Sequence, residues 1–153
     1  MNRVFCAALM FSVSFTLCRA GVLRDSTAVD STSRGDLTVI VKDLENDDGM
    51  VRIALSDSEE DYNSRGTPFR RASVPINERV AHHTFTDMPY GEYAVKIFHD
   101  EDGDKELDTG LFGIPTEAYG FSNNASASFG PPDFEDARFL FNKKILTIEI
   151  SVD

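Results

Sequence analysis

The chain has 153 residues, of which 41% are hydrophobic and 27% are charged, and its formal net charge is −11. This length and composition predict one globular domain with a packed core. Because the chain is strongly acidic, we do not expect it to bind nucleic acid or anionic membrane surfaces, whereas cation binding is compatible with its charge.

Residues 1–20 have the pattern of a cleavable signal peptide. Arg3 provides a basic start, and the apolar run Val4–Leu17 is shorter than the roughly 20 residues that span a bilayer. Cys18 and Ala20 place small residues at the two positions that a signal peptidase inspects. We therefore expect a secreted or periplasmic protein with no stable membrane insertion after cleavage. A buried N-terminal strand or helix is the alternative interpretation.

Cleavage after Ala20 would change both the charge and the thiol content of the chain. It removes two arginines, which takes the formal net charge from −11 to −13, and it removes both cysteines, Cys6 and Cys18. The mature chain would then have no disulfide, thiol nucleophile or thiolate metal ligand. Residues 21–35 are rich in Ser, Thr and Asp and are predicted to form a flexible leader before a domain at 36–153.

Residues 36–153 alternate between apolar and polar side chains, which indicates β-strands. Strands at Leu37–Lys42 and Met50–Leu55 flank the turn residues 46–49, so we predict a β-hairpin. A second hairpin is predicted from 79–86 and 92–99, around Met88-Pro89-Tyr90-Gly91. Further strands are predicted at 72–76, 137–142 and 143–152, and a helical turn near Glu59–Tyr62.

The segment 100–136 lacks a strand pattern but contains many aromatic and aliphatic residues, and we expect it to be ordered and packed on the rest of the domain. With about six or seven strands, the pattern predicts an all-β fold, a single immunoglobulin-like or transthyretin-like antiparallel β-sandwich. Tyr93 follows the turn glycine Gly91 by two residues. We interpret it as a structural tyrosine whose hydroxyl binds loop backbone.

The densest group of chemically active side chains is the acidic loop at 100–108. Carboxylates at Asp100, Asp102, Asp104 and Asp108 occupy relative positions one, three, five and nine. Calcium requires six to eight oxygen ligands, and this spacing in a turning loop can point carboxylates at one centre, with a backbone carbonyl near Glu106. The loop is not an EF-hand, because Gly103 is at position four and Leu111 is at position twelve. The alternative is a solvated acidic turn.

The three histidines offer a second metal hypothesis. His82 and His83 point to opposite faces of their predicted strand, so one of them could join His99 across the second hairpin and bind zinc beside a carboxylate. Structural or surface histidines are the commoner explanation. Neither a nucleophile elbow nor a phosphate-binding glycine loop is present.

The stretch PYGEYAVKIFHDEDGDKELDTGLFGIPTEAYGFSNNA, followed by GPPDFEDARF, closely resembles the exported bacterial domain-of-unknown-function family 2141 (DUF2141). The likeness covers Leu37 to the C-terminus. It implies a periplasmic or secreted β-sandwich and brings no activity with it. In that family, the positions of Asp102 and Asp104 are often asparagine, which keeps a side-chain oxygen and favours ligation. A glycine usually follows the second of these positions, where this chain has Lys105.

The second signature of that family corresponds to residues 113–124. The resemblance implies a glycine-punctuated loop that could supply Glu117 or Asn123 as an additional ligand, or else a packed crossover to the last strands.

The sequence therefore favours an exported non-enzymatic β-sandwich whose acidic loop binds calcium. A metal-dependent hydrolase and a metal-free module that binds an extracellular protein or glycan remain the alternatives.

Overall fold

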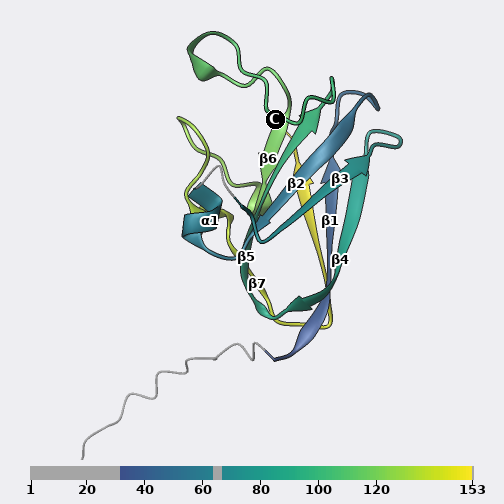
Figure 1. Cartoon of the computed structure of the whole chain (residues 1–153), viewed down its shortest axis with the longest axis vertical. Coiled ribbons are helices and arrows are strands. Elements are labelled where there is room, and N and C mark those ends of the chain that lie inside the picture. The colour runs from purple at the N-terminus through teal and green to yellow at the C-terminus, as the bar shows by residue number, and fades with distance from the viewer. Residues whose placement is uncertain (1–31, 64–66, 153) are drawn as a thin grey trace, which may run out of the picture.

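The computed structural model describes residues 32–63 and 67–152 (Figure 1). The predicted signal peptide at 1–20 and most of the predicted leader at 21–35 lie outside the described residues. The strand β1 (Arg34–Lys42) begins within the last two residues of that leader.

Two sheets pack against each other to form a β-sandwich (Figure 1). The smaller sheet has the order β4 (Ala81–Pro89), β1 and β8 (Ile145–Ser151). The larger sheet has the order β3 (Arg70–Pro75), β2 (Met50–Ser56), β5 (Gly91–Asp100) and β6 (Tyr119–Phe121), and β7 (Phe139–Phe141) also pairs with β5. The predicted all-β sandwich is confirmed. It has eight described strands, and the pairing of β1 with β8 is parallel while the other strand pairs are antiparallel.

Short helices interrupt the connections. They are α1 (Glu59–Asn63), where a helical turn was predicted, α2 (Phe134–Ala137), and the 3₁₀ helices η1 (Leu111–Gly113) and η2 (Ser122–Asn124). None of the helices in the described part of the chain has the length and apolar character needed to cross a bilayer.

The core lies between the two sheets and follows the alternation of the sequence. β1 and β2 bury every second residue, and burial of one such aliphatic side chain contributes about 1.5–3 kcal/mol. The residues of β1, β2 and β5 that form this core are Leu37, Val39, Val41, Val51, Ile53, Leu55, Tyr93, Val95 and Ile97. Tyr93 is buried, and its hydroxyl donates a hydrogen bond to the Pro89 carbonyl at 2.9 Å, which confirms its predicted structural role.

The first predicted hairpin is wrong, because β1 and β2 lie in different sheets. β1 pairs with β4 and β8, whereas β2 pairs with β3 and β5. The connection at 43–49 crosses between the sheets, and the Asp47 carboxylate there accepts backbone N–H groups from Glu78 at 3.1 Å and Arg79 at 2.6 Å. Its Leu44 side chain is fully buried. Two strands that each bury one face can pack face to face as well as pair edge to edge, and alternation does not distinguish these arrangements.

The second predicted hairpin is wrong for the same reason. β4 pairs with β1, and β5 pairs with β2, although Tyr90 alone separates β4 from β5 in the sequence. The ring of Tyr90 packs edge-on against Phe141 at a centroid distance of 5.4 Å, at the point where the chain passes from one sheet to the other.

The segment 100–136 is only partly packed on the sandwich. It supplies β6 and α2, and Phe134 is buried. Leu111, Phe112 and Phe129, however, are 84%, 98% and 96% exposed, so the prediction that these side chains pack is wrong. Residues 109–115 form a tight turn of their own, with Gly110 N–H bonded to Ile114 O at 2.7 Å, and this turn projects from one end of the sandwich (Figure 1).

Candidate metal centre

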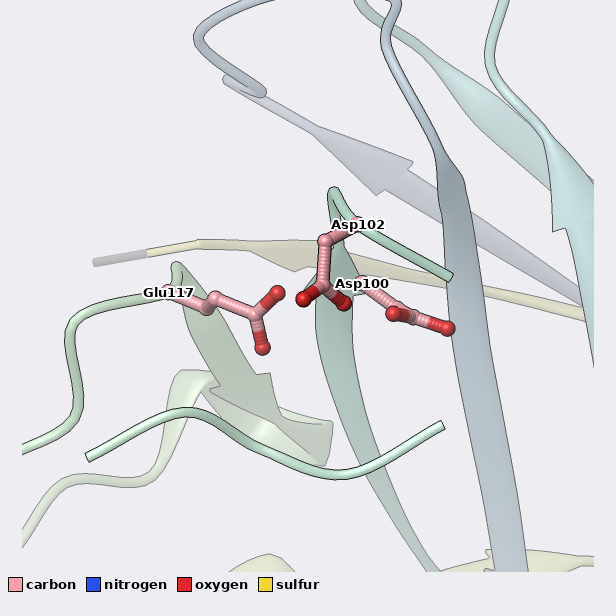
Figure 2. A group of neighbouring side chains, drawn as sticks. All are labelled: Asp100, Asp102 and Glu117. Atoms are coloured by element: carbon pink, nitrogen blue, oxygen red, sulfur yellow. The ribbon is translucent and has the colours of Figure 1, made fainter. Parts of the chain in front are cut away.

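Three carboxylates meet at the end of the sandwich where β5 stops and β6 begins. Asp100 is the last residue of β5, Asp102 follows it in the acidic loop, and Glu117 lies just before β6. One oxygen from each lies within 4.8 Å of the others. Figure 2 shows the carboxylates of Glu117 and Asp102 facing each other, with Asp100 on the far side of Asp102. Asp100 is fully buried, Glu117 is partly buried and Asp102 is exposed.

Asp100 is held by an arginine and by its own loop. Its Oδ2 accepts hydrogen bonds from Arg52 Nε and Nη2, both at 2.5 Å, and its Oδ1 accepts the Gly103 N–H at 2.9 Å. Burial alone would raise the pKa of Asp100. The hydrogen bonds and the charge of Arg52, together with the backbone N–H groups of Gly103 and Lys105, instead hold that pKa below its usual value. Asp100 is therefore a carboxylate at neutral pH.

The next two aspartates organise the loop backbone. Asp102 Oδ1 accepts the Asp104 N–H at 3.0 Å, and Asp104 Oδ1 accepts the Glu106 N–H at 2.7 Å. These side-chain-to-backbone bonds over two residues are Asx turns, which bend the chain tightly. These turns explain how the acidic loop curves so tightly although Gly103 is its one glycine.

Glu117 joins the two ends of the acidic loop. Its Oε1 accepts the Glu101 N–H at 3.0 Å, and its Oε2 accepts the Asp108 N–H at 3.1 Å. Of the four aspartates predicted from the sequence as metal ligands, two lie in this group and two do not. The structure groups Asp100 and Asp102 with Glu117, while the carboxylates of Asp104 and Asp108 lie outside this group. Asn123, the other additional ligand implied by the family resemblance, instead donates hydrogen bonds to the carbonyls of Asp136 and Arg138.

The charges of the group suit a divalent cation. Asp100, Asp102 and Glu117 with Arg52 carry a formal charge of −2, which one divalent cation neutralises. The three carboxylates offer one converging oxygen each, and calcium takes six to eight oxygen ligands, including water and carbonyl oxygens. The arrangement can therefore hold a hard cation, with the other oxygens coming from solvent or backbone.

A family model described as "Uncharacterized protein conserved in bacteria (DUF2141)" matches residues 39–149 of the chain. The chain belongs to the DUF2141 family. No curated protein and no solved structure matches it.

This DUF2141 protein has lysine where a glycine is expected from the family pattern, yet the backbone there keeps a glycine-like shape. Lys105 has a φ of 73°, and Gly103 has a φ of 84°. Position six of a calcium loop makes a sharp turn for which glycine is the usual residue. Lys105 occupies this position when Asp100 is counted as one. Its backbone makes the sharp turn although the residue is not glycine.

The histidines of the DUF2141 protein do not form the predicted zinc pair. His99 belongs to the larger sheet, whereas His82 and His83 are on β4 in the smaller sheet, and the hairpin that would have joined them is absent. His99 is fully buried, and its Nε2 lies 2.6 Å from the Asp48 carbonyl oxygen. Since a carbonyl only accepts, Nε2 carries the proton and donates it to Asp48. His99 therefore holds the 43–49 connection against β5.

An acidic pocket of about 420 Å³ opens beside Glu117. Four carboxylates line it, those of Asp43, Glu45, Glu101 and Glu117. Its charge favours the approach of cations to the loop.

Proposed function

We propose that this DUF2141 protein is an exported, non-enzymatic β-sandwich whose acidic loop binds calcium, with Asp100, Asp102 and Glu117 as carboxylate ligands. The observation that carries the proposal is the convergence of these three side chains, from two segments, to within 4.8 Å. Like charges this close repel each other, and a bound cation adds attractions to all three carboxylates that outweigh this repulsion.

The proposed role of the cation is to stabilise the loop. Glu117 already connects Glu101 and Asp108 through their backbone N–H groups, so a cation bound to Glu117, Asp102 and Asp100 would fix the end of β5 against the start of β6. Extracellular and periplasmic compartments hold enough calcium to fill a site of modest affinity. Export and calcium binding therefore support each other.

A thermal melt of the purified chain, with and without calcium, tests the proposal. Calcium at about 100 times its dissociation constant should add about 2.7 kcal/mol to the free energy of unfolding, and magnesium should add less. Glu117→Gln should remove most of this shift, and Asp102→Asn, which loses the charge but keeps one side-chain oxygen, should reduce it. Asp104→Asn makes the same charge change in the same loop and should leave the shift in place.

Two results would count against this proposal. The absence of any shift at millimolar calcium would refute calcium binding. Equal loss of the shift in Asp104→Asn and Asp102→Asn would refute the proposed ligand set and favour the four aspartates predicted from the sequence.

The pocket beside Glu117 supports a second candidate, a metal-dependent hydrolase. A cation held by Glu117 would border this pocket of about 420 Å³, and hydrolytic metal sites need such a concave space with an open coordination position. Calcium- or zinc-dependent cleavage of ester or phosphoester substrates that is lost in Glu117→Gln would establish this candidate. A partner-binding role draws its support from the exposed Leu111 and Phe112 at the tip of the neighbouring turn.

A further inference from the structure

A second pocket, with the opposite charge, lies on the outer face of the larger sheet. It has a volume of about 460 Å³, within the range of small-molecule sites. Arg52 pairs across strands with Phe98 and Ser73, and Ala54 pairs with Lys96 and Arg71, so these side chains share one face of β3, β2 and β5. Asp61 and Tyr62 of α1 form part of the rim.

Positive charge is concentrated in this pocket. The lining contains four basic side chains, Arg52, Arg71, Lys96 and Lys105, and one acidic side chain, Asp61. The whole chain has 15 basic and 26 acidic residues, so this excess of basic residues runs against the overall charge. A concave surface lined by one sign of charge focuses the field and attracts small ions of the opposite sign.

Lys96 is a partly buried ammonium whose described contacts are with neutral groups. Its Nζ donates a hydrogen bond to the Tyr62 carbonyl at 2.5 Å and lies 3.9 Å from the centre of the Tyr62 ring. Burial lowers the pKa of Lys96. A desolvated cation held only by a carbonyl and an aromatic face is stabilised further when an anion binds beside it.

Arg52 and Lys105 contribute differently. Arg52 makes two contacts with Asp100 at 2.5 Å, and these neutralise its charge. Arg52 therefore forms part of the pocket wall without adding net charge to it. Lys105 is exposed and comes from the acidic loop, whose carboxylates meet elsewhere. Lys96 and Lys105 therefore present charge that their described contacts do not neutralise.

The rest of the wall is apolar. Phe98, Ala54 and Ala72 are partly buried on the sheet, and Pro68 lies at the edge. An occupant that matches both the charge and this wall has an anionic head and an apolar body.

We propose that this pocket binds a small organic acid, with its carboxylate at Lys96 and Lys105 and its apolar body against Phe98 and Ala54. The site differs from the proposed calcium site in the charge of its ligand and uses none of its three carboxylates, although Lys105 belongs to the acidic loop. Arg52, which binds Asp100 and also lines the pocket, connects the two sites.

Titration with 2-naphthoate, followed by amide NMR shifts, tests the proposal. The neutral isostere 2-naphthamide serves as the second probe. The buffer should be freed of calcium with a chelating resin, since soluble chelators are themselves carboxylates. We expect saturable shifts on β2, β3 and β5 with 2-naphthoate, and at least tenfold weaker binding of 2-naphthamide.

Charge-removing variants complete the test. Lys96→Gln should weaken 2-naphthoate binding at least tenfold. Lys105→Gln should also weaken this binding. Because Lys105 is exposed, its replacement should not disturb folding, so this variant tests the proposal even if Lys96→Gln folds poorly. Lys143→Gln removes an equally exposed charge outside the pocket and should have no effect. Equal affinity for the two probes, or unchanged binding in both pocket variants, would overturn the proposal. Because calcium is absent throughout, neither result bears on the calcium site.

Discussion

The backbone of one residue, Lys105, determines the shape of the acidic loop. Its φ of 73° lies in the left-handed region, which costs a non-glycine residue roughly 1–2 kcal/mol. The Asx turn at Asp102 ends just before Lys105 and the Asx turn at Asp104 encloses it, so the loop keeps this strained conformation.

Replacing Lys105 with glycine should therefore stabilise the protein. Glycine adopts this conformation freely, although its greater freedom in the unfolded chain offsets part of the gain, so we expect an increase of about 0.5–1 kcal/mol in Lys105→Gly. Lys105→Ala removes the same side chain but keeps the Cβ atom, and it should show no comparable gain. Urea unfolding without calcium measures both changes, and equal stability of the two variants would show that backbone strain is not the cause.

At the residue scale, the spacing of the sequence predicts two of the three carboxylates of the candidate site. Asp100 and Asp102 were predicted because they are close in sequence and share a spacing. Glu117 entered only through the family resemblance. It reaches the loop because β6, three residues long, pairs with β5, with Tyr119 opposite Phe98. A strand of three residues shows no usable alternation, so the sequence carried no pattern that placed Glu117 beside Asp102.

At the scale of elements, one ion pair joins β2 to β5 across the outer face of the larger sheet. The side chain of Asp100 is fully buried and that of Arg52 is 17% exposed. Removing one partner of such a pair leaves a desolvated charge and is strongly destabilising. The pair therefore stabilises the two central strands, and it also orients the first carboxylate of the candidate metal site.

Acid should weaken this connection. The pKa of Asp100 lies below its ordinary value, so its stabilising contribution is complete at pH values above about 5 and is lost as the pH falls through about 4 and below. In calcium-free buffer, Asp100→Asn should lower stability at pH 7 by about 3 kcal/mol, the low end for a broken buried pair, because Arg52 is 17% exposed. The same variant should reduce the stability difference between pH 7 and pH 3. Chemical denaturation at the two pH values measures this.

The surface pair formed by Glu92 and Arg138 provides the control. The two side chains are 51% and 35% exposed, so Glu92→Gln should cost no more than about 1 kcal/mol. If Glu92→Gln lowered the free energy of unfolding as much as Asp100→Asn, burial would not be the reason that the Arg52–Asp100 pair stabilises the protein.

Individual strands were predictable, and their partners were not. Alternation located β1, β2, β5 and β8 within a few residues, because each buries one face. It did not show that β1 pairs with β8, since the two strands are separated by nearly the whole domain and their pairing depends on the sandwich as a unit.

At the scale of the whole molecule, the acidic charge is unevenly distributed. Carboxylates line the pocket beside Glu117, and basic side chains line the pocket on the larger sheet. These two pockets of opposite charge on one domain are what the two proposed sites rest on, one for a cation and one for an organic anion.

The export proposal applies to the molecule as a whole. In a bacterial host, cleavage after Ala20 should yield a protein that begins at Gly21, which intact-mass spectrometry of the periplasmic and secreted fractions can establish. Leu9→Arg places a charge in the apolar run and should block processing, whereas Leu23→Arg lies beyond the cleavage point and should not. Recovery of the unprocessed chain in the cytosol, with Met1 retained, would contradict export.

The parallel pairing of β1 with β8 has a consequence for the order of folding. β1 is the middle strand of its sheet, and one of its two edges pairs with residues 145–151, which lie more than 100 positions further along the chain. The smaller sheet therefore closes only after residues 145–151 have been synthesised, and pairing over this sequence separation is slow. This order of folding suits the proposed export, because a chain whose smaller sheet is still open can pass through a secretion channel.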